Sequence, residues 1–180
     1  MKYCKRCTYP IVAVNLSVND DGVCSGCITH DEKVNINWRE REEEFKELVL
    51  KYKDNSNKNY DCIIPVSGGK DSHFQAWYLK NLGLNPLLVT YYTHNYSKTG
   101  EANLKNIGDS LGLDHYVFTP SRHVIAKMNK IGFEMTGDMS WHFHCGAWTI
   151  PFQVGVKHNI PLLIYGEHGF TDLAGQYSMN

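Results

Sequence analysis

Val66-Ser67-Gly68-Gly69-Lys70-Asp71-Ser72 is the stretch of sequence that decides the fold of this chain. It directly follows an apolar run that starts at Tyr60, and it directly precedes a segment with a helical pattern. At a junction between a strand and a helix, glycines let backbone N–H groups turn toward one point, and the helix N-terminus adds the positive end of its dipole. The stretch therefore predicts an anion site that fits a pyrophosphate.

The side chains of the same stretch suit a phosphate ligand. Lys70 supplies a fixed cation, Ser67 and Ser72 supply hydroxyl donors, and Asp71 is placed to hold Mg²⁺ or to cap the helix. The spacing differs from that of the Walker loop, in which four residues separate a glycine from Gly-Lys and a Ser or Thr follows the lysine. The difference argues against ordinary transfer of a γ-phosphoryl group.

Beyond Asn59, short apolar runs alternate with amphipathic segments, a pattern typical of a parallel sheet with crossover helices. Gly83 and Gly112 stand where two helices should each end in a left-handed residue, just before the next strand. We therefore predict an α/β fold with a doubly wound parallel sheet. Its expected strands cover residues 60–66, 86–93, 115–119 and 160–165, and its expected helices begin near Asp71, Gly100, Ser121 and Cys145.

Two Cys-x-x-Cys pairs precede this region. Cys4-Lys-Arg-Cys7 and Cys24-Ser-Gly-Cys27 are separated by sixteen residues, which is within the spacing expected of a four-cysteine zinc site. We assign Cys4, Cys7, Cys24 and Cys27 as zinc ligands. Four cysteines leave no open coordination position, so we expect the zinc to be structural. A pair of disulfides and a redox-active dithiol are the alternatives.

The 180 residues give room for one ordinary domain and a small appendage. We divide the chain into a zinc ribbon at residues 1–35, a charged helical connector at 36–57 and the α/β domain at 58–180. A net charge of −1 creates no general field for nucleic acid, so we expect no nucleic-acid partner. We find neither a signal peptide nor an apolar run of the roughly 20 residues that span a bilayer. We expect a cytoplasmic protein without membrane insertion.

The Ser-Gly-Gly-Lys-Asp-Ser loop after a first strand resembles the loop of the PP-loop ATP pyrophosphatases. Enzymes of that superfamily cleave ATP between its α and β phosphates and adenylate an oxygen of the substrate. The resemblance implies an adenine nucleotide alpha hydrolase-like fold, ATP with Mg²⁺ as cofactor, and Lys70 and Asp71 as catalytic residues. The residues that it assigns to ATP are Ser67, Gly68, Gly69, Lys70, Asp71, Ser72 and Gly166.

Within that superfamily the chain resembles the N-acetyl sugar amidotransferases of surface-polysaccharide and O-antigen biosynthesis. The resemblance combines the ribbon, the connector and the loop with weaker segments that span nearly the whole chain. These segments are Thr93-His94-Asn95-Tyr96, Gly100-Glu101-Ala102-Asn103-Leu104, His144-Cys145-Gly146 and Ile160-Pro161-Leu162-Leu163-Ile164-Tyr165-Gly166-Glu167. Members of the family are longer than this chain, so we expect the α/β domain to be truncated at its C-terminal end.

The resemblance implies conversion of the acetamido group of a nucleotide-linked N-acetyl sugar into an acetamidino group. ATP would activate the amide oxygen as an imidoyl adenylate, and ammonia would displace AMP. Family members are thought to receive ammonia from a glutaminase partner. Since we recognise no glutaminase domain in this sequence, we expect this chain to depend on such a partner.

Four residues near the C-terminal end of the chain are candidate substrate contacts. His144 and Cys145 lie in the reactive segment Trp141-His142-Phe143-His144-Cys145-Gly146. If this segment is a strand, His142 and His144 share one face and suit substrate or a second metal; if it starts a helix, Cys145 is a small buried residue. Glu167 and His168 follow an expected strand, where open α/β sheets bind ligands.

Two other functions remain open. A PP-loop enzyme that thiolates tRNA would also join a zinc ribbon to this loop, but it calls for a basic face and reactive cysteines. Outside the ribbon the sequence has only Cys62 and Cys145, and Cys62 falls within the first expected strand. A nucleotide-binding or interaction module without catalysis would share both motifs, and turnover of ATP separates it from the enzymes.

Overall fold

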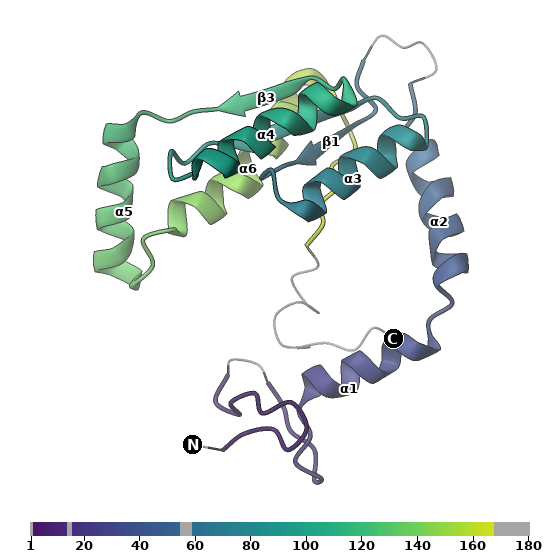
Figure 1. The fold of residues 1–180 in the computed structure, drawn as a ribbon, viewed down its shortest axis with the longest axis vertical. Coiled ribbons are helices and arrows are strands. Elements are labelled where there is room, and N and C mark those ends of the chain that lie inside the picture. Colours follow the sequence, from purple (N-terminus) through teal and green to yellow (C-terminus); the bar gives the residue numbers. More distant parts are fainter. Residues whose placement is uncertain (1, 14–15, 55–58, 168–180) are drawn as a thin grey trace. The chain divides into compact units, whose positions relative to one another are not determined.

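The computed structural model describes residues 2–13, 16–54 and 59–167. The chain divides into two compact units, one that contains the residues up to Glu44 together with Glu167, and one that covers Phe45–Gly166. Each unit is described by itself below (Figure 1). Among the described residues, no helix is long and apolar enough to cross a membrane.

The first unit is built around cysteines. Two isolated antiparallel bridges, Tyr3 with Pro10 and Val18 with Cys24, shape its two turns. The helix α1 (Ser25–Glu32) follows the second turn directly, continues into the short 3₁₀ helix η1 (Lys33–Asn35), and was not predicted from the sequence. The buried apolar residues here are the cysteines Cys4, Cys24 and Cys27, with Leu16, Val18 and Val23 packed against them. So small an apolar cluster offers little hydrophobic stabilisation, which is why small domains of this kind need a staple such as a metal.

The helix α2 (Trp38–Leu50) runs from the first unit into the second. Of its apolar residues, Val49 is buried in the core of the second unit and Phe45 packs against that core. Trp38 and Leu48 are exposed. Phe45 stacks on Tyr78 with ring centroids 6.2 Å apart, so the C-terminal turns of α2 belong to the α/β core.

The second unit has a parallel sheet in the order β1-β2-β3. Its strands β1 (Cys62–Pro65), β2 (Pro86–Tyr91) and β3 (His115–Phe118) pair in parallel, with Cys62 opposite Pro86 and Leu88 opposite His115. On the other side of β1, Leu163 forms an isolated parallel bridge with Ile63. The chain therefore runs from β1 outward to β3 and then returns to the opposite side of β1, which is the doubly wound arrangement predicted from the sequence.

The fourth predicted strand, at residues 160–165, is reduced to that single bridge. Its two hydrogen bonds are Ile63 N–H to Leu162 O at 2.8 Å and Ile164 N–H to Ile63 O at 2.9 Å. The next bond in a parallel ladder would come from the N–H of residue 65. Because Pro65 has no N–H, the pairing ends there.

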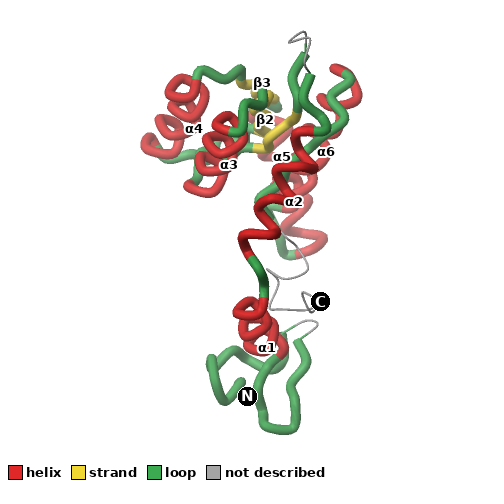
Figure 2. The backbone as a smooth tube through the Cα atoms, turned by 90° about the vertical axis from the view of Figure 1, so that its right-hand side faces the viewer, coloured by secondary structure: helices red, strands yellow, loops and turns green. Residues whose placement is uncertain are grey.

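Four helices complete the second unit, namely α3 (Lys70–Asn81), α4 (Lys98–Leu111), α5 (Arg122–Thr136) and α6 (Trp141–His158). Figures 1 and 2 show α3 and α4 on one face of the sheet and α6 on the other. Cys62 and Ile64 point into the core on the first face, whereas Ile63 points into the core beneath α6. Because both faces of β1 are covered by helices, consecutive residues of this strand are apolar.

The helix ends follow the signals in the sequence. Ser97 and Ser121 cap α4 and α5 by accepting hydrogen bonds from Gly100 N–H and Val124 N–H. Gly83 and Gly112 adopt positive φ angles of 81° and 58°, as predicted for left-handed residues after α3 and α4. The last helix begins at Trp141 instead of near Cys145, so the strand interpretation of residues 141–146 is wrong.

Candidate functional site

The loop at residues 66–69 lies between the end of β1 and the start of α3. Val66 N–H still donates to Val89 O at 2.9 Å, so the loop leaves the sheet only after this residue. Gly69 precedes α3 in an extended conformation, and no side chain caps the helix there. Gly69 therefore offers no side-chain acceptor to the first backbone N–H groups of α3, which suits an anionic ligand.

Gly68 is required by its conformation and by its neighbour. Its φ angle is +80°, and a Cβ atom at this position would lie 2.8 Å from the backbone nitrogen of Leu104 on α4. Any other residue would be strained and would collide with the backbone of α4. The loop is thus packed directly on α4, and its backbone is held in place.

Lys70 and Asp71 form an ion pair at the start of α3. Lys70 Nζ lies 2.7 Å and 2.8 Å from the two carboxylate oxygens of Asp71, and the side chains are 88% and 77% exposed. An ion pair this exposed contributes little to stability. A phosphate and a metal ion could therefore separate the two groups at low cost, with Lys70 turning to the phosphate and Asp71 to Mg²⁺.

The two serines of the loop have different surroundings. Ser67 Oγ accepts a hydrogen bond from Gly69 N–H at 3.3 Å, and Ser67 lines a cavity next to the loop. Ser72 is buried, and its hydroxyl donates to the carbonyl oxygen of Gly69 at 3.0 Å. In this conformation Ser72 supports the loop from within, whereas Ser67 faces the space where a ligand would enter.

The cavity beside Ser67 has a volume of about 260 Å³. It lies next to the loop that follows β1 and to the segment that follows β2. Open α/β sheets bind their ligands at this edge, beside the strand where the order of the sheet reverses. The lining residues are Ser67, Thr93, Asn95, Tyr96, Asn129, Met139, Ser140, His142 and Phe143. Thr93, Asn95 and Tyr96 lie in a segment noted for its family resemblance, whereas nothing in the sequence pointed to Asn129, Met139 or Ser140.

A buried histidine connects the wall of the cavity to the sheet. His142 is 3% exposed, its Nδ1 lies 3.1 Å from Tyr91 Oη, and its Nε2 lies 2.6 Å from Asn129 Oδ1. Burial lowers the pKa of His142, so the imidazole is neutral at neutral pH, although Asp138 acts in the opposite direction. Because Asn129 Oδ1 can only accept, we assign the proton to Nε2, and Nδ1 then accepts from Tyr91 O–H.

The segment after β2 is fixed by two contacts. His94 has a positive φ of 62°, and its Nε2 lies 2.9 Å from the carbonyl oxygen of Pro120, which joins this segment to the end of β3. Tyr96 stacks on Tyr92 with ring centroids 5.1 Å apart, and Tyr92 O–H donates to Glu101 at 2.6 Å. The contact of His94 with Pro120 and the stacking of Tyr96 on Tyr92 thus fix the part of the cavity wall that Tyr96 forms.

The other predicted ligand contacts are not among the residues that line this cavity. His144 is exposed and Cys145 is half-buried on α6. Gly166 packs against α3, where a Cβ atom would collide with the side-chain amide of Gln75, so it lies beside the helix that follows the loop. Glu167 is exposed and belongs to the first unit, and His168 lies outside the described residues.

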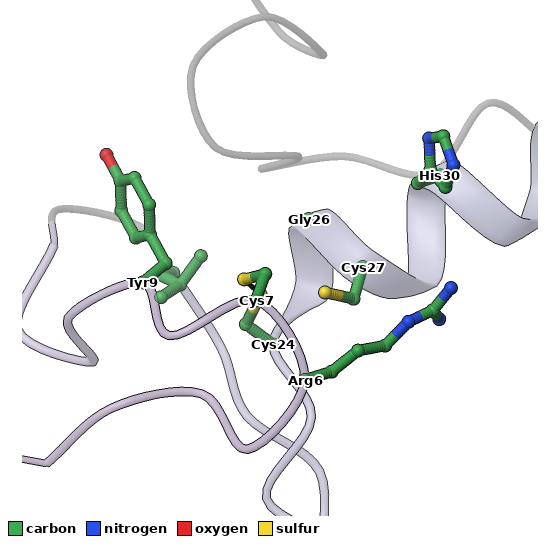
Figure 3. Close-up of a pocket in the computed structure, with 8 residues that line it drawn as sticks. Arg6, Cys7, Tyr9, Cys24, Gly26, Cys27 and His30 are labelled. Atoms are coloured by element: carbon green, nitrogen blue, oxygen red, sulfur yellow. Dashed lines mark hydrogen bonds between the residues drawn. The ribbon is translucent and has the colours of Figure 1, made fainter.

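The four cysteines of the first unit form the second candidate site. Their sulfur atoms all lie within 4.8 Å of one another, with Cys4 to Cys27 at 4.0 Å and Cys7 to Cys24 at 3.6 Å. Tetrahedral zinc with Zn–S bonds of about 2.3 Å requires sulfur atoms roughly 3.8 Å apart. The arrangement fits zinc, and Figure 3 shows Cys7 facing Cys24 and Cys27 near the start of α1.

Backbone amides support this cluster. Arg6 N–H and Cys24 N–H point to Cys4 Sγ at 3.4 Å and 3.3 Å. Backbone hydrogen bonds, that of Cys7 foremost, lower the pKa of the Cys4 thiol to about 6, whereas burial raises the pKa of Cys27 to about 12. The Arg6 side chain pairs with Asp31, donating from Nη2 to Oδ1 at 2.7 Å, and fixes the first turn to α1.

The cluster lines a separate cavity of about 390 Å³ in the first unit. Its wall includes Leu16. Tyr9 and His30 line it as well, together with Cys7 (Figure 3). His30 is exposed, and it is not among the residues that the structure gathers as metal ligands. Within the described residues, the four cysteines are the one group of three or more candidate ligands.

No protein-family model matches this chain, and no curated protein matches it. The solved structures that are similar to it in fold include two synthetases. The NMN synthetase from Francisella tularensis has a TM-score of 0.52 and 13% identity, over 69% of this chain and 52% of that one. The NH3-dependent NAD synthetase from Campylobacter jejuni subsp. jejuni NCTC 11168, in complex with the nitrate ion, has a TM-score of 0.54 and 13% identity, over 80% of this chain and 62% of that one.

These similarities confirm the predicted fold class. At 13% identity they show the fold alone, an α/β fold with a parallel sheet. This chain spans 52% and 62% of the lengths of the two structures.

Proposed function

We propose that this chain is an ATP-dependent enzyme of the PP-loop type that adenylates an oxygen of its substrate and lets ammonia displace AMP. The observation that supports the proposal best is the loop between β1 and α3, with Gly68 packed on α4 and Ser67 facing a cavity. One structure with a similar fold is by name an NH3-dependent NAD synthetase, which favours ammonia as the nitrogen source.

The loop suits cleavage between the α and β phosphates. The backbone N–H groups at the start of α3 would hold the departing pyrophosphate, and Lys70 would neutralise its developing charge. Asp71, released from its ion pair with Lys70, would hold Mg²⁺, which would offset the negative charge of the phosphates. ATP supplies the adenylyl group, and the residues of this chain bind and orient it.

The substrate that we propose is an N-acetyl sugar linked to a nucleotide, as in the synthesis of surface polysaccharides such as the O-antigen. The acetamido oxygen attacks the α phosphorus, and the bond to the β-phosphate oxygen breaks, releasing pyrophosphate. Ammonia then adds to the activated carbon, and AMP leaves with the former amide oxygen. The products are an acetamidino sugar, AMP and pyrophosphate, with a proton released.

We propose in addition that the ammonia comes from a separate glutaminase partner and that the four cysteines hold a structural zinc ion. The donor set supports zinc, since four thiolate ligands at tetrahedral spacing leave no position for a substrate. Zinc would then add the stability that the small apolar cluster of the first unit does not supply.

The test is incubation of the full chain with ATP, Mg²⁺, ammonium and UDP-N-acetylglucosamine, with mass spectrometry of the sugar and assays of AMP and pyrophosphate. We expect an acetamidino product and equal amounts of AMP and pyrophosphate. Lys70→Ala should abolish both, whereas Lys80→Ala, which removes an exposed lysine from the last turn of the same helix, should not. Pyrophosphate release that is equal in Lys70→Ala and the unchanged chain would contradict the proposal.

A further inference from the structure

The cavity next to the loop carries no formal charge on its walls. Its lining consists of amides, hydroxyls, a neutral imidazole, a methionine and aromatic rings, and none of the lining residues among those described is Asp, Glu, Lys or Arg. The loop beside it is the place for the charged phosphates, where Lys70 lies. The cavity therefore offers hydrogen bonds and apolar faces, but no counter-ion.

The orientation of one lining side chain is fixed by buried groups. Asn129 Oδ1 accepts from His142 Nε2–H, and His142 Nδ1 accepts from the hydroxyl of Tyr91, which is itself buried on β2. Since the oxygen of the Asn129 amide is used in this way, its two N–H donors remain for a ligand in the cavity. An amide held by a buried chain of hydrogen bonds presents its donors without a loss of side-chain entropy on binding.

From these two features we infer that the cavity binds the part of the substrate that accepts the adenylyl group, that the accepting group is uncharged, and that Asn129 is its specificity-determining contact. This inference rests on the proposed function. A carboxylate acceptor would need a cation to offset its desolvation and its repulsion from the ATP phosphates. The walls of the cavity supply no cation, whereas an amide or hydroxyl oxygen would be satisfied by the Asn129 N–H donors.

The remaining lining residues favour a hydroxyl-rich acceptor. Thr93, Asn95 and Ser140 add three neutral hydrogen-bonding groups to the lining of the same cavity. Tyr96 and Phe143 add apolar faces of the kind that cover the C–H side of a sugar ring. A sugar that carries an acetamido group matches both properties, so the chemistry of the cavity favours an amide over a carboxylate as the group that is adenylated.

The experiment compares two matched sugars, N-acetyl-D-glucosamine and D-glucuronate, by NMR titration of the full chain with Mg²⁺ and α,β-methylene-ATP, which cannot be cleaved between the α and β phosphates. We expect N-acetylglucosamine to bind and glucuronate not to bind. Asn129→Asp keeps an acceptor for His142 but replaces the N–H donors by an oxygen. It should therefore weaken the binding of N-acetylglucosamine by about tenfold or more. Asn106→Asp, the same change at an exposed position on α4, should leave the affinity for N-acetylglucosamine unaltered.

A second pair of variants tests whether His142 positions Asn129. His142→Gln retains a donor and an acceptor, whereas His142→Leu retains neither. We expect His142→Gln to keep most of the affinity for N-acetylglucosamine and His142→Leu to lose it. Circular dichroism checks the fold of each variant, and Asn129→Ser, which also removes the amide donors, replaces Asn129→Asp if the latter does not fold.

Three results would overturn the inference: equal or tighter binding of glucuronate, an unchanged affinity in Asn129→Asp, or no binding of either sugar. Weaker binding of α,β-methylene-ATP in Asn129→Asp, with N-acetylglucosamine unaffected, would assign the cavity to the nucleoside and overturn it as well. Failure of the unchanged chain to bind α,β-methylene-ATP while it still binds N-acetylglucosamine would instead reject the proposed function and leave the cavity assignment standing.

Discussion

The backbone of Gly146 on α6 lies directly against the ring of Tyr91 at the end of β2. A Cβ atom at residue 146 would approach Cγ and Cε2 of the ring to 2.6 Å. The same tyrosine donates its hydroxyl to His142, one turn earlier on α6. Helix α6 therefore packs on the sheet at Tyr91. The hydrogen bonds that join Tyr91, His142 and Asn129 depend on this close approach.

Gly146→Ala should lower the free energy of unfolding. The added methyl group must displace the Tyr91 ring, and overpacking of this kind costs about 1–3 kcal/mol, although alanine favours the helix by roughly 0.5–1 kcal/mol. Denaturation of the single variants and of Gly146→Ala combined with Tyr91→Ala measures the coupling. We expect the combined loss to be smaller than the sum of the two single losses. Additive losses would show that the two residues do not interact.

Gly68→Ala should abolish binding of α,β-methylene-ATP. The left-handed φ and the backbone of Leu104 both exclude a side chain, so the loop must move off α4. Gly137→Ala is the matched control, because Gly137 also has a positive φ of 73° but no atom within 4 Å of an added Cβ. Equal nucleotide affinity in the two variants would argue against a role of the Gly68 backbone at the phosphates.

Cys62 should resist alkylation while the chain is folded. It is fully buried in β1, and burial raises the pKa of its thiol to about 12, so the reactive thiolate is scarce at pH 8. Cys145 is half-buried on α6 and should be alkylated first. Mass spectrometry after brief treatment with iodoacetamide, with zinc present, identifies the modified residue. Modification of Cys62 ahead of Cys145 would contradict the position of β1.

The same raised pKa predicts the direction of a pH effect. Unfolding exposes Cys62 and returns its pKa to about 9, so the unfolded chain loses its proton at a lower pH than the folded chain. The contribution of this thiol to stability is complete below pH 9 and is lost as the pH rises toward about 12. Cys62→Ala should therefore show a shallower fall in the free energy of unfolding across this range than the unchanged chain.

Zinc should be present at about one equivalent in protein purified without chelator. Cys7→Ser removes one of the four ligands and should reduce the zinc content strongly, because four thiolates are required to close the site. Cys145→Ser removes a cysteine outside the cluster and should leave the zinc content unchanged. A zinc content below half an equivalent in the unchanged chain would reject the zinc assignment.

The sequence predicted the parts of the structure that depend on local chemistry. The loop at residues 66–69 follows a strand and opens a helix, α5 begins next to Ser121, and Gly83 and Gly112 are left-handed. Each of these features depends on residues that are close in sequence, so the pattern contains the needed information.

Other features depend on contacts between distant residues. The bridge at Leu163 stays short because Pro65, on the neighbouring strand, lacks an N–H. Asn129 lines the cavity because α5 and α6 pack together and bring His142 within hydrogen-bonding distance of Asn129. Helix α6 starts at Trp141, four residues before the predicted start, and Ser140 before it forms no side-chain cap.

The most direct test of the central claim follows the oxygen atom. An N-acetyl sugar acceptor labelled with ¹⁸O in its amide is incubated with the chain, ATP, Mg²⁺ and ammonium, and the phosphate products are examined by mass spectrometry. Adenylation of the amide oxygen predicts that AMP carries the label and that pyrophosphate does not. Formation of ADP, or AMP without the label, would contradict the account.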